Sequence, residues 1–278
     1  MKHIVCYSGG HSSALVAIEV ARKFGKENVI LLNHDIASTV ESSDIKRFKK
    51  QVAEYLGLEI TFANIKGLDA DSLPDQFEVV IDAKAFKVGN GSALCTSRLK
   101  TEPFMQYLKA NFADKECICY YGFDTNETAR IQRRSSIMGQ LGYKTDYPLA
   151  LWPTRTIKST KEVGIEPPNT YNVFKHGNCV GCLKAGRQHW YVTYVYRYDI
   201  FQKAKETEEI IGYTIIKDIG LDELEPMFAK MKLNNVPATE HIQAGEFWKI
   251  AKDAINAADS EQLDMFGRDD AKPCECTF

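Results

Sequence analysis

The chain has 278 residues, of which 44% are hydrophobic and 26% charged, and its formal net charge is −2. This composition is typical of a folded globular protein, and the near-zero charge argues against a general binder of nucleic acids or membrane surfaces. No apolar run reaches the length of a membrane span, and the apolar stretch at the N-terminus is too short for a signal peptide. We therefore expect a cytoplasmic protein that needs no membrane.

Strands and helices alternate in the first part of the sequence. Apolar runs predict short strands over residues 3–7, 28–32, 58–63 and 117–123. Apolar residues at helical spacing predict helices over residues 12–24, 42–56, 102–112 and 126–141. Residues 77–81 fit either a strand or a helix. This alternation predicts an α/β fold with a doubly wound parallel sheet, in a nucleotide-binding domain over residues 1–150.

The pattern changes after residue 150. Prolines and a glycine- and cysteine-rich loop predict an irregular metal-loop region over residues 151–190. A helical C-terminal part follows over residues 191–263, with helical pieces at 200–210, 221–232 and 239–255. Residues 264–278 are polar and without pattern, which is typical of a flexible tail.

A turn rich in glycine and serine joins the first strand to the first helix. It consists of Ser8, Gly9, Gly10, His11, Ser12 and Ser13. Adjacent glycines allow several backbone N–H groups to point at one phosphate, and the helix N-terminus adds partial positive charge. A plain strand-to-helix turn with a serine cap is the alternative, but the density of glycine and serine favours a phosphate site.

Two further segments follow predicted strands at their carboxyl ends, where ligands of α/β sheets bind. Asp35 follows the second strand, where an acidic residue also serves as a helix cap. Gly122, Glu127 and Arg130 follow the fourth strand. A capping box accounts for Glu127 as well as a functional role does, whereas the guanidinium of Arg130 suits bidentate binding of phosphate or sulfate.

Close cysteine pairs in a cytosolic chain indicate metal or redox chemistry more than structural disulfides. Cys179 and Cys182 form a CxxC motif in a glycine-rich loop, His176 lies three residues before it, and Cys95 stands alone. Three cysteines and His176 fit a zinc site, three cysteines alone fit a 4Fe–4S cluster, and a metal-free CxxC fits a redox pair. We favour a metal site. Cys276 is in the polar tail, where we do not expect a residue of the hydrophobic core.

The turn at residues 8–13 resembles the Ser-Gly-Gly-x-Asp-Ser signature of the PP-loop, or N-type, ATP pyrophosphatases. This adenine nucleotide alpha-hydrolase-like superfamily includes tRNA thiolation enzymes and the adenylyl-sulfate and phosphoadenylyl-sulfate (PAPS) reductases. ATP-cleaving members carry aspartate where this chain has Ser12, which favours the reductase branch over magnesium-assisted ATP cleavage. The resemblance implies an adenine nucleotide that meets Asp35, Gly122, Glu127 and Arg130.

The cysteines carry a second resemblance, to the adenylyl-sulfate reductases. Residues 93–103 resemble their Cys-Cys-x-x-Arg-Lys-x-x-Pro segment, with Leu94 in place of the first cysteine and one residue added before Pro103. The resemblance implies a 4Fe–4S cluster on Cys95, Cys179 and Cys182, and it favours iron–sulfur over zinc. Glu275-Cys276 resembles the tail whose cysteine attacks sulfur in those enzymes.

Three functions are consistent with these observations. In a PAPS-reductase-like enzyme, Cys276 attacks the sulfur of an adenylyl sulfate held by residues 8–13 and Arg130, and a thioredoxin-like reductant regenerates the thiol. In an ATP-dependent sulfurtransferase, a nucleic acid is adenylated and then thiolated, and basic residues beside the cysteine loop face its phosphates. The third function is catalytically idle binding of a nucleotide or metal.

Overall fold

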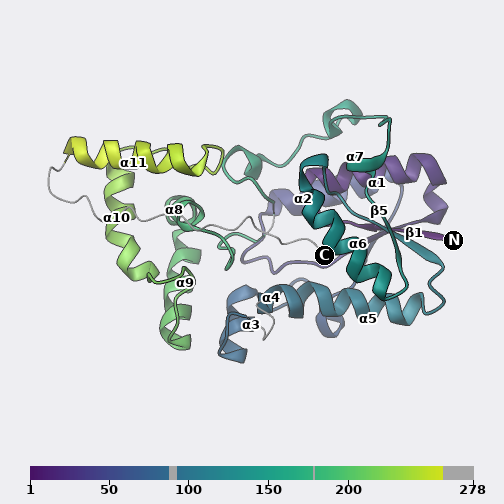
Figure 1. Ribbon diagram of the computed structural model, residues 1–278, viewed down its shortest axis with the longest axis horizontal. Coiled ribbons are helices and arrows are strands. Elements are labelled where there is room, and N and C mark those ends of the chain that lie inside the picture. The colour runs from purple at the N-terminus through teal and green to yellow at the C-terminus, as the bar shows by residue number, and fades with distance from the viewer. Residues whose placement is uncertain (88–92, 178, 259–278) are drawn as a thin grey trace.

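The computed structural model describes residues 1–87, 93–177 and 179–258 (Figure 1). Its described residues contain one parallel sheet of five strands in the order β3-β2-β1-β4-β5. The strands are β1 (Lys2–Cys6), β2 (Val29–Asn33), β3 (Ile60–Phe62), β4 (Cys117–Tyr120) and β5 (Lys144–Asp146). The predicted α/β class and parallel sheet are confirmed. We did not predict β5, because its sequence Lys-Thr-Asp is polar and too short to form an apolar run.

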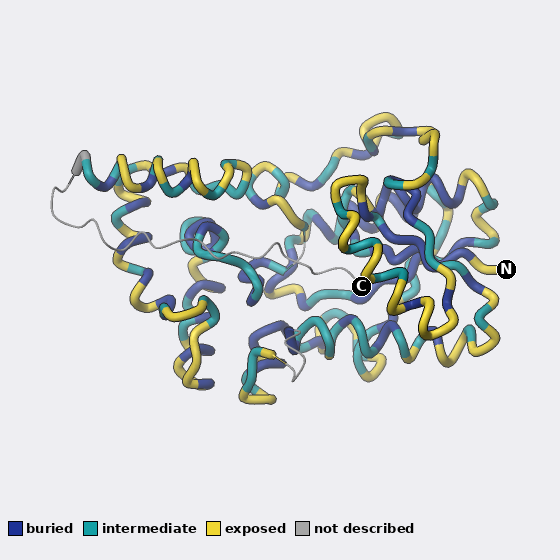
Figure 2. Tube along the Cα trace, in the orientation of Figure 1, coloured by how far each residue is buried: buried dark blue, intermediate teal, exposed yellow. Residues whose placement is uncertain are grey.

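Alternating side chains of the strands pack against helices on both faces of the sheet. Val5 and Tyr7 face a core built with α1 (His11–Phe24) and α2 (Ser43–Leu56). Ile4 and Cys6 face the opposite core, built with α5 (Glu102–Asn111) and α6 (Thr128–Gln140). Helices on both faces are compatible with a doubly wound fold. The central strands β1, β2 and β4 are mostly buried, whereas the edge strands β3 and β5 are partly exposed (Figure 2).

The ambiguous segment around residue 80 forms a helix, α3 (Gln76–Ala83). Asp75 precedes it, and its side chain accepts hydrogen bonds from the backbone N–H groups of Phe77 and Glu78. The Glu78 carboxylate in turn accepts from the backbone N–H of Asp75, which completes a capping box. This cap satisfies N–H groups that a helix start leaves unpaired. A short helix, α4 (Leu94–Thr96), continues through a π-helical turn, Ser97–Thr101, into α5.

The C-terminal helices gather at one end of the molecule, away from the sheet (Figure 1). After the short α7 (Pro148–Leu151), they are α8 (Arg187–Tyr196), α9 (Tyr198–Ile211), α10 (Leu221–Leu233) and α11 (Ala244–Ala258). Their core includes Trp190, Phe201, Phe228 and Phe247, and α3 packs into it through Phe77. The three predicted helical pieces are confirmed, although the last begins at Ala244 rather than at residue 239.

The remaining segments contain short 3-10 turns, at Lys26–Asn28, Ile65–Gly67, Thr125–Glu127, Thr160–Val163 and Asn169–Asn172. The last two lie between α7 and α8, in the segment predicted to be irregular. Within the described ranges, no helix is both long and apolar enough to cross a membrane.

Candidate functional site

The glycine-rich turn lies at the switch point of the sheet. β1 is flanked by β2 on one side and β4 on the other, and residues 8–13 leave its carboxyl end and enter α1. In open α/β sheets, ligands bind in the crevice at the carboxyl ends of the strands, at the point where the strand order reverses. Residues 8–13 therefore occupy the position expected of a ligand-binding loop. We call them the phosphate loop, after the ligand that the sequence predicts.

Gly9 has no room for a side chain. Its φ is +83°, and a Cβ would lie 2.5 Å from Cδ of Lys49, which is far inside van der Waals contact. The stem of Lys49 thus supports the loop from α2. Lys49 was not predicted, although its spacing from Ile45 and Val52 places it on the apolar stripe of that helix.

The first turn of α1 presents hydrogen-bond donors at the loop. Gly10 precedes the helix without a side-chain cap, so the first N–H groups point out of the helix end. Ser13 Oγ donates to the carbonyl of Gly10 at 2.8 Å, and Ser8 Oγ donates to Ser13 Oγ at 3.2 Å. These bonds hold the serine side chains beside the helix end, but they already use both hydroxyl protons, so the donors available to an anion are the backbone N–H groups of the first turn.

The segment between α7 and α8 covers this loop. His11 N donates to the Tyr171 hydroxyl at 3.2 Å, and Thr160 N donates to His11 Nε2 at 3.3 Å. The buried carboxylate of Glu19 holds the start of the segment by accepting from Ile157 N at 3.0 Å. Burial raises the pKa of Tyr171, so its hydroxyl stays protonated. The sequence contains no pattern that marks Tyr171 as a neighbour of the loop.

Asp35 belongs to a buried ion cluster rather than to open solvent. Lys49 Nζ lies 3.2 Å from Asp35 Oδ1 and 3.0 Å from Glu41 Oε2, and Lys46 Nζ lies 3.4 Å from the same Asp35 oxygen. Burial raises the pKa of Glu41, and the adjacent Lys49 opposes that effect. Asp35 therefore reaches the phosphate loop through Lys49, which lies beneath Gly9.

The chain that follows β4 contributes the predicted Gly122, Glu127 and Arg130, the last from α6. A Cβ on Gly122 would lie 3.0 Å from the backbone N of Ser13, so the chain after β4 lies directly against the phosphate loop. Glu127 Oε2 accepts from Asp124 N at 2.9 Å in a capping box and also pairs with Arg130. The guanidinium of Arg130 lies 4.5 Å from the Phe123 ring centroid. Glu127 thus has the capping role, and it positions Arg130.

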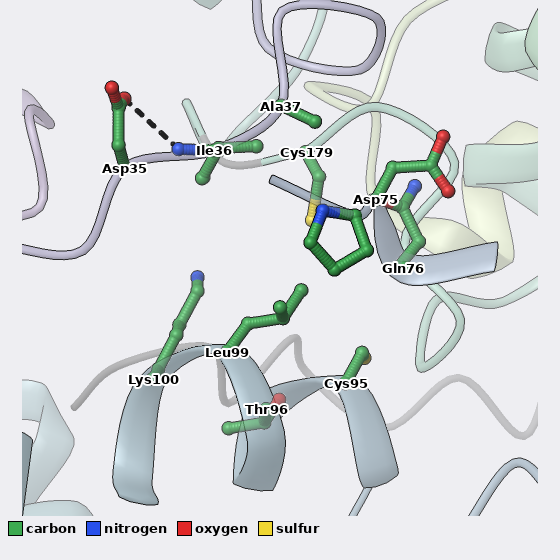
Figure 3. Close-up of a pocket in the computed structure, with 11 residues that line it drawn as sticks. Asp35, Ile36, Ala37, Asp75, Gln76, Cys95, Thr96, Leu99, Lys100 and Cys179 are labelled. Carbon is green, nitrogen blue, oxygen red and sulfur yellow. Dashed lines mark hydrogen bonds between the residues drawn. The ribbon is translucent and has the colours of Figure 1, made fainter. Parts of the chain in front are cut away.

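A second feature is a small opening with a cavity volume of about 30 Å³ (Figure 3). Cys95 of α4 and Cys179 of the CxxC loop both line it, together with Asp75, Lys100 and the backbone after β2. Asp35 is at its edge, with the carboxylate turned toward Ile36 N and away from Cys95 (Figure 3). Two thiols from distant segments therefore meet at one opening, which Asp35 and Lys49 connect to Gly9.

The other predicted metal ligands do not line this opening. Cys182 is only 5% exposed, and His176 is on the surface. Among the described residues, no group of three His, Cys, Asp or Glu side chains is arranged to hold a metal ion. Zinc and iron–sulfur sites need about four ligands. Cys276, the predicted nucleophile, lies outside the described residues.

A π-helical turn leads into α5, at the place where the resemblance to adenylyl-sulfate reductases predicts one added residue before Pro103. Residues 97–101 form a π-helical turn, the form by which a helix accommodates one inserted residue, and such turns are frequent at functional sites. Lys100 lies in this turn and is 8% exposed at the opening. The insertion therefore lies beside Cys95 rather than in a surface loop.

Comparison with known proteins adds no family. No protein-family model matches the chain, and no curated protein matches it.

Proposed function

We propose that this protein is an enzyme that binds an adenine nucleotide at residues 8–13 and performs sulfur chemistry, as the resemblance to PAPS reductases implies. The observation that carries the proposal is the position of the phosphate loop. It lies at the switch point of a parallel sheet, next to an opening that Cys95 and Cys179 share. A loop for a phosphorylated ligand and a pair of thiols at one edge of the sheet fit this chemistry.

The nucleotide phosphates would accept hydrogen bonds from the backbone N–H groups of the first turn of α1, and from the hydroxyls of Ser8 and Ser13 once these turn away from their present acceptors. Arg130, held by Glu127 and by the Phe123 ring, would add positive charge from the side of β4. The groups are preorganised, because Gly9 and Gly122 admit no side chain between their supporting elements.

In the reductase reaction, the Cys276 thiolate attacks the sulfur of an adenylyl sulfate. A sulfur–sulfur bond forms, the sulfur–oxygen bond breaks, and its electron pair leaves on the nucleotide phosphate. A thiol reductant of the thioredoxin class then attacks the cysteine sulfur, so that sulfite leaves and a mixed disulfide remains for the second reductant thiol to reduce.

The predicted metal centre is tested by the donor set. Two thiols line the opening, whereas Cys182 and His176 do not. This arrangement does not complete the coordination that zinc or a cluster requires, so no step of the proposal passes through a metal. The iron–sulfur and zinc assignments, and a magnesium ion at the phosphates, stay predictions.

An ATP-dependent sulfurtransferase is the second candidate, and one observation favours it. Cys95 and Cys179 both line the opening, where one thiol can carry sulfur as a persulfide received from a sulfur donor. The outer sulfur attacks the adenylated nucleic acid and AMP leaves. The other thiol then attacks the inner sulfur, which breaks the persulfide bond, and a thiol reductant reduces the resulting disulfide. This reaction needs ATP and releases pyrophosphate, whereas the reductase reaction releases sulfite.

Anaerobically purified protein should therefore be assayed with labelled ATP and with adenylyl sulfates. We expect sulfite release, and we expect removal of residues 273–278 to abolish it while nucleotide affinity stays unchanged, because a nucleophile acts mainly in the transition state. Pyrophosphate release, or sulfite release by the truncated protein, moves the sulfurtransferase to first place. If neither sulfite nor pyrophosphate is released with either substrate, catalytically idle binding is the function that remains.

A further inference from the structure

The CxxC loop is bonded by elements that lie far from it in the chain. Gln76 of α3, which is 2% exposed, donates to the carbonyl of Val180 at 2.8 Å. Val180 N in turn donates to the carbonyl of Val40 at 2.9 Å. Gly181 has φ +72°, and a Cβ there would lie 2.5 Å from Cγ2 of Ile200 on α9. The loop is therefore fitted closely between α3 and α9.

One histidine holds the end of this loop. Cys182 N donates to His189 Nε2 at 3.1 Å. A ring nitrogen that accepts a hydrogen bond carries no proton, so the proton of a neutral His189 is on Nδ1. Nδ1 lies 2.5 Å from Glu240 Oε1. His189 therefore links the backbone of Cys182 to a carboxylate that lies between α10 and α11.

The same carboxylate also holds the chain before the loop. Glu240 Oε2 accepts from Lys175 N at 2.7 Å. The side chains of Glu240 and His189 are only 15% and 11% exposed, which strengthens bonds that water would otherwise weaken. Burial alone raises the pKa of Glu240, but its hydrogen bond with His189 brings the pKa below its ordinary value. Glu240 thus remains ionised and joins both ends of the CxxC loop.

We infer that Glu240 and His189 are positioning residues for the thiols. They keep Cys182 inside the protein and hold the loop so that Cys179 lines the opening with Cys95. The inference rests on the proposed function only through the sulfurtransferase candidate, which gives these thiols a chemical task. The positioning itself is a property of the described residues, and it can be measured without turnover.

The test measures alkylation of Cys182 by iodoacetamide in the full-length protein, with mass spectrometry of the modified peptide. Glu240→Ala and His189→Ala should each speed alkylation at least about tenfold, a typical effect of removing a partner that orients a ligand. The double variant should react no faster than the faster single variant, because the two residues act as one unit. His189→Gln should restore protection, since an amide offers an acceptor and a donor at similar spacing.

His241→Ala is the matched control. His241 is adjacent to Glu240 and bonds the same segment, at the carbonyl of Tyr171 (2.6 Å), but among the described residues no hydrogen bond links it to the CxxC loop. Cys182 should stay protected in this variant. The inference is overturned if His241→Ala exposes Cys182 as Glu240→Ala does, or if the alanine variants leave alkylation unchanged. If Glu240→Ala does not fold, the comparison of His189→Ala with His189→Gln decides.

Two further readouts separate this inference from the proposed function. Calorimetry should give wild-type nucleotide affinity for both alanine variants. The kcat for product formation should fall about tenfold or more, and KM should stay unchanged. A wild-type protein that binds no adenine nucleotide defeats the proposed function, and the Cys182 measurement still decides the positioning.

Discussion

The phosphate loop is one uninterrupted segment between β1 and α1, whereas the thiols of the opening come from α4 and from the CxxC loop. The loop depends on backbone: glycine conformation, helix-end donors and the space that Lys49 and Gly122 leave it. The opening depends on side chains that distant elements bring together. A methyl group added to a glycine should therefore be enough to disrupt the phosphate loop. The opening should instead be disrupted by removal of one of its side chains or of a residue that holds them in place.

The largest expected effect separates the two regions by function. In the sulfurtransferase reaction, Cys179→Ala should abolish sulfur transfer, because a thiolate of the opening is the reacting group, whereas sulfite release by the reductase reaction, in which Cys276 is the nucleophile, should persist. Nucleotide affinity, measured by calorimetry, should not change. Cys119→Ala, in the buried core of β4, is the matched control and should keep turnover in the folded fraction. Equal losses in both variants would mean that Cys179 has only a packing role.

A methyl group at Gly9 should damage the other region. Its Cβ collides with the stem of Lys49, so the loop must shift. Loss of one or two bonds to a charged phosphate, at about 1.5–3 kcal/mol each, weakens nucleotide affinity about a hundredfold. Gly67→Ala is the matched control, since Gly67 has φ +67° and nothing lies within 4 Å of its Cβ position. If Gly9→Ala loses no more nucleotide affinity than Gly67→Ala does, the positive φ that both positions share explains the loss, and the collision with Lys49 has no part in it.

Gly122→Ala should have a smaller effect on the same affinity. Its Cβ would lie 3.0 Å from the backbone of Ser12 and Ser13, so the start of α1 must move by a few tenths of an ångström. We expect about tenfold weaker binding, equivalent to roughly one weakened hydrogen bond. Gly139→Ala, in a helix with open space around it, should leave affinity at the wild-type value. Wild-type affinity of Gly122→Ala would show that phosphate does not use the first turn of α1.

Tyr171→Phe should have the smallest effect, with the opposite sign. The hydroxyl oxygen takes the His11 N–H that a phosphate oxygen would accept. Its removal frees this donor, so nucleotide affinity should rise about two- to fivefold, less than the value of a full neutral hydrogen bond. Titration calorimetry with ATP and an adenylyl sulfate measures the change. Weaker binding would mean that the hydroxyl donates to the ligand instead.

The fold was predictable where local sequence and tertiary packing agree. Strands β1, β2 and β4 are apolar runs because both of their faces are buried. α3 was ambiguous because five successive residues, Phe77–Ile81, are mostly apolar and satisfy either period, and the Asp75 cap together with the core of the C-terminal helices makes this segment a helix. β5 carries no apolar signal and is defined by its hydrogen bonds to β4.

By itself, the sequence determined the glycine-rich turn between β1 and α1 and predicted a phosphate site there, because a strand, adjacent glycines and a helix start are consecutive and need no distant partner to form an anion site. Only the tertiary structure decided which side chains support it or compete with it, namely Lys49 and Tyr171. It likewise decided that Cys95 and Cys179 share one opening and that Glu240 reaches Cys182 through His189. These contacts join residues far apart in the chain, and their spacing in sequence carries no information about a distance that only packing sets.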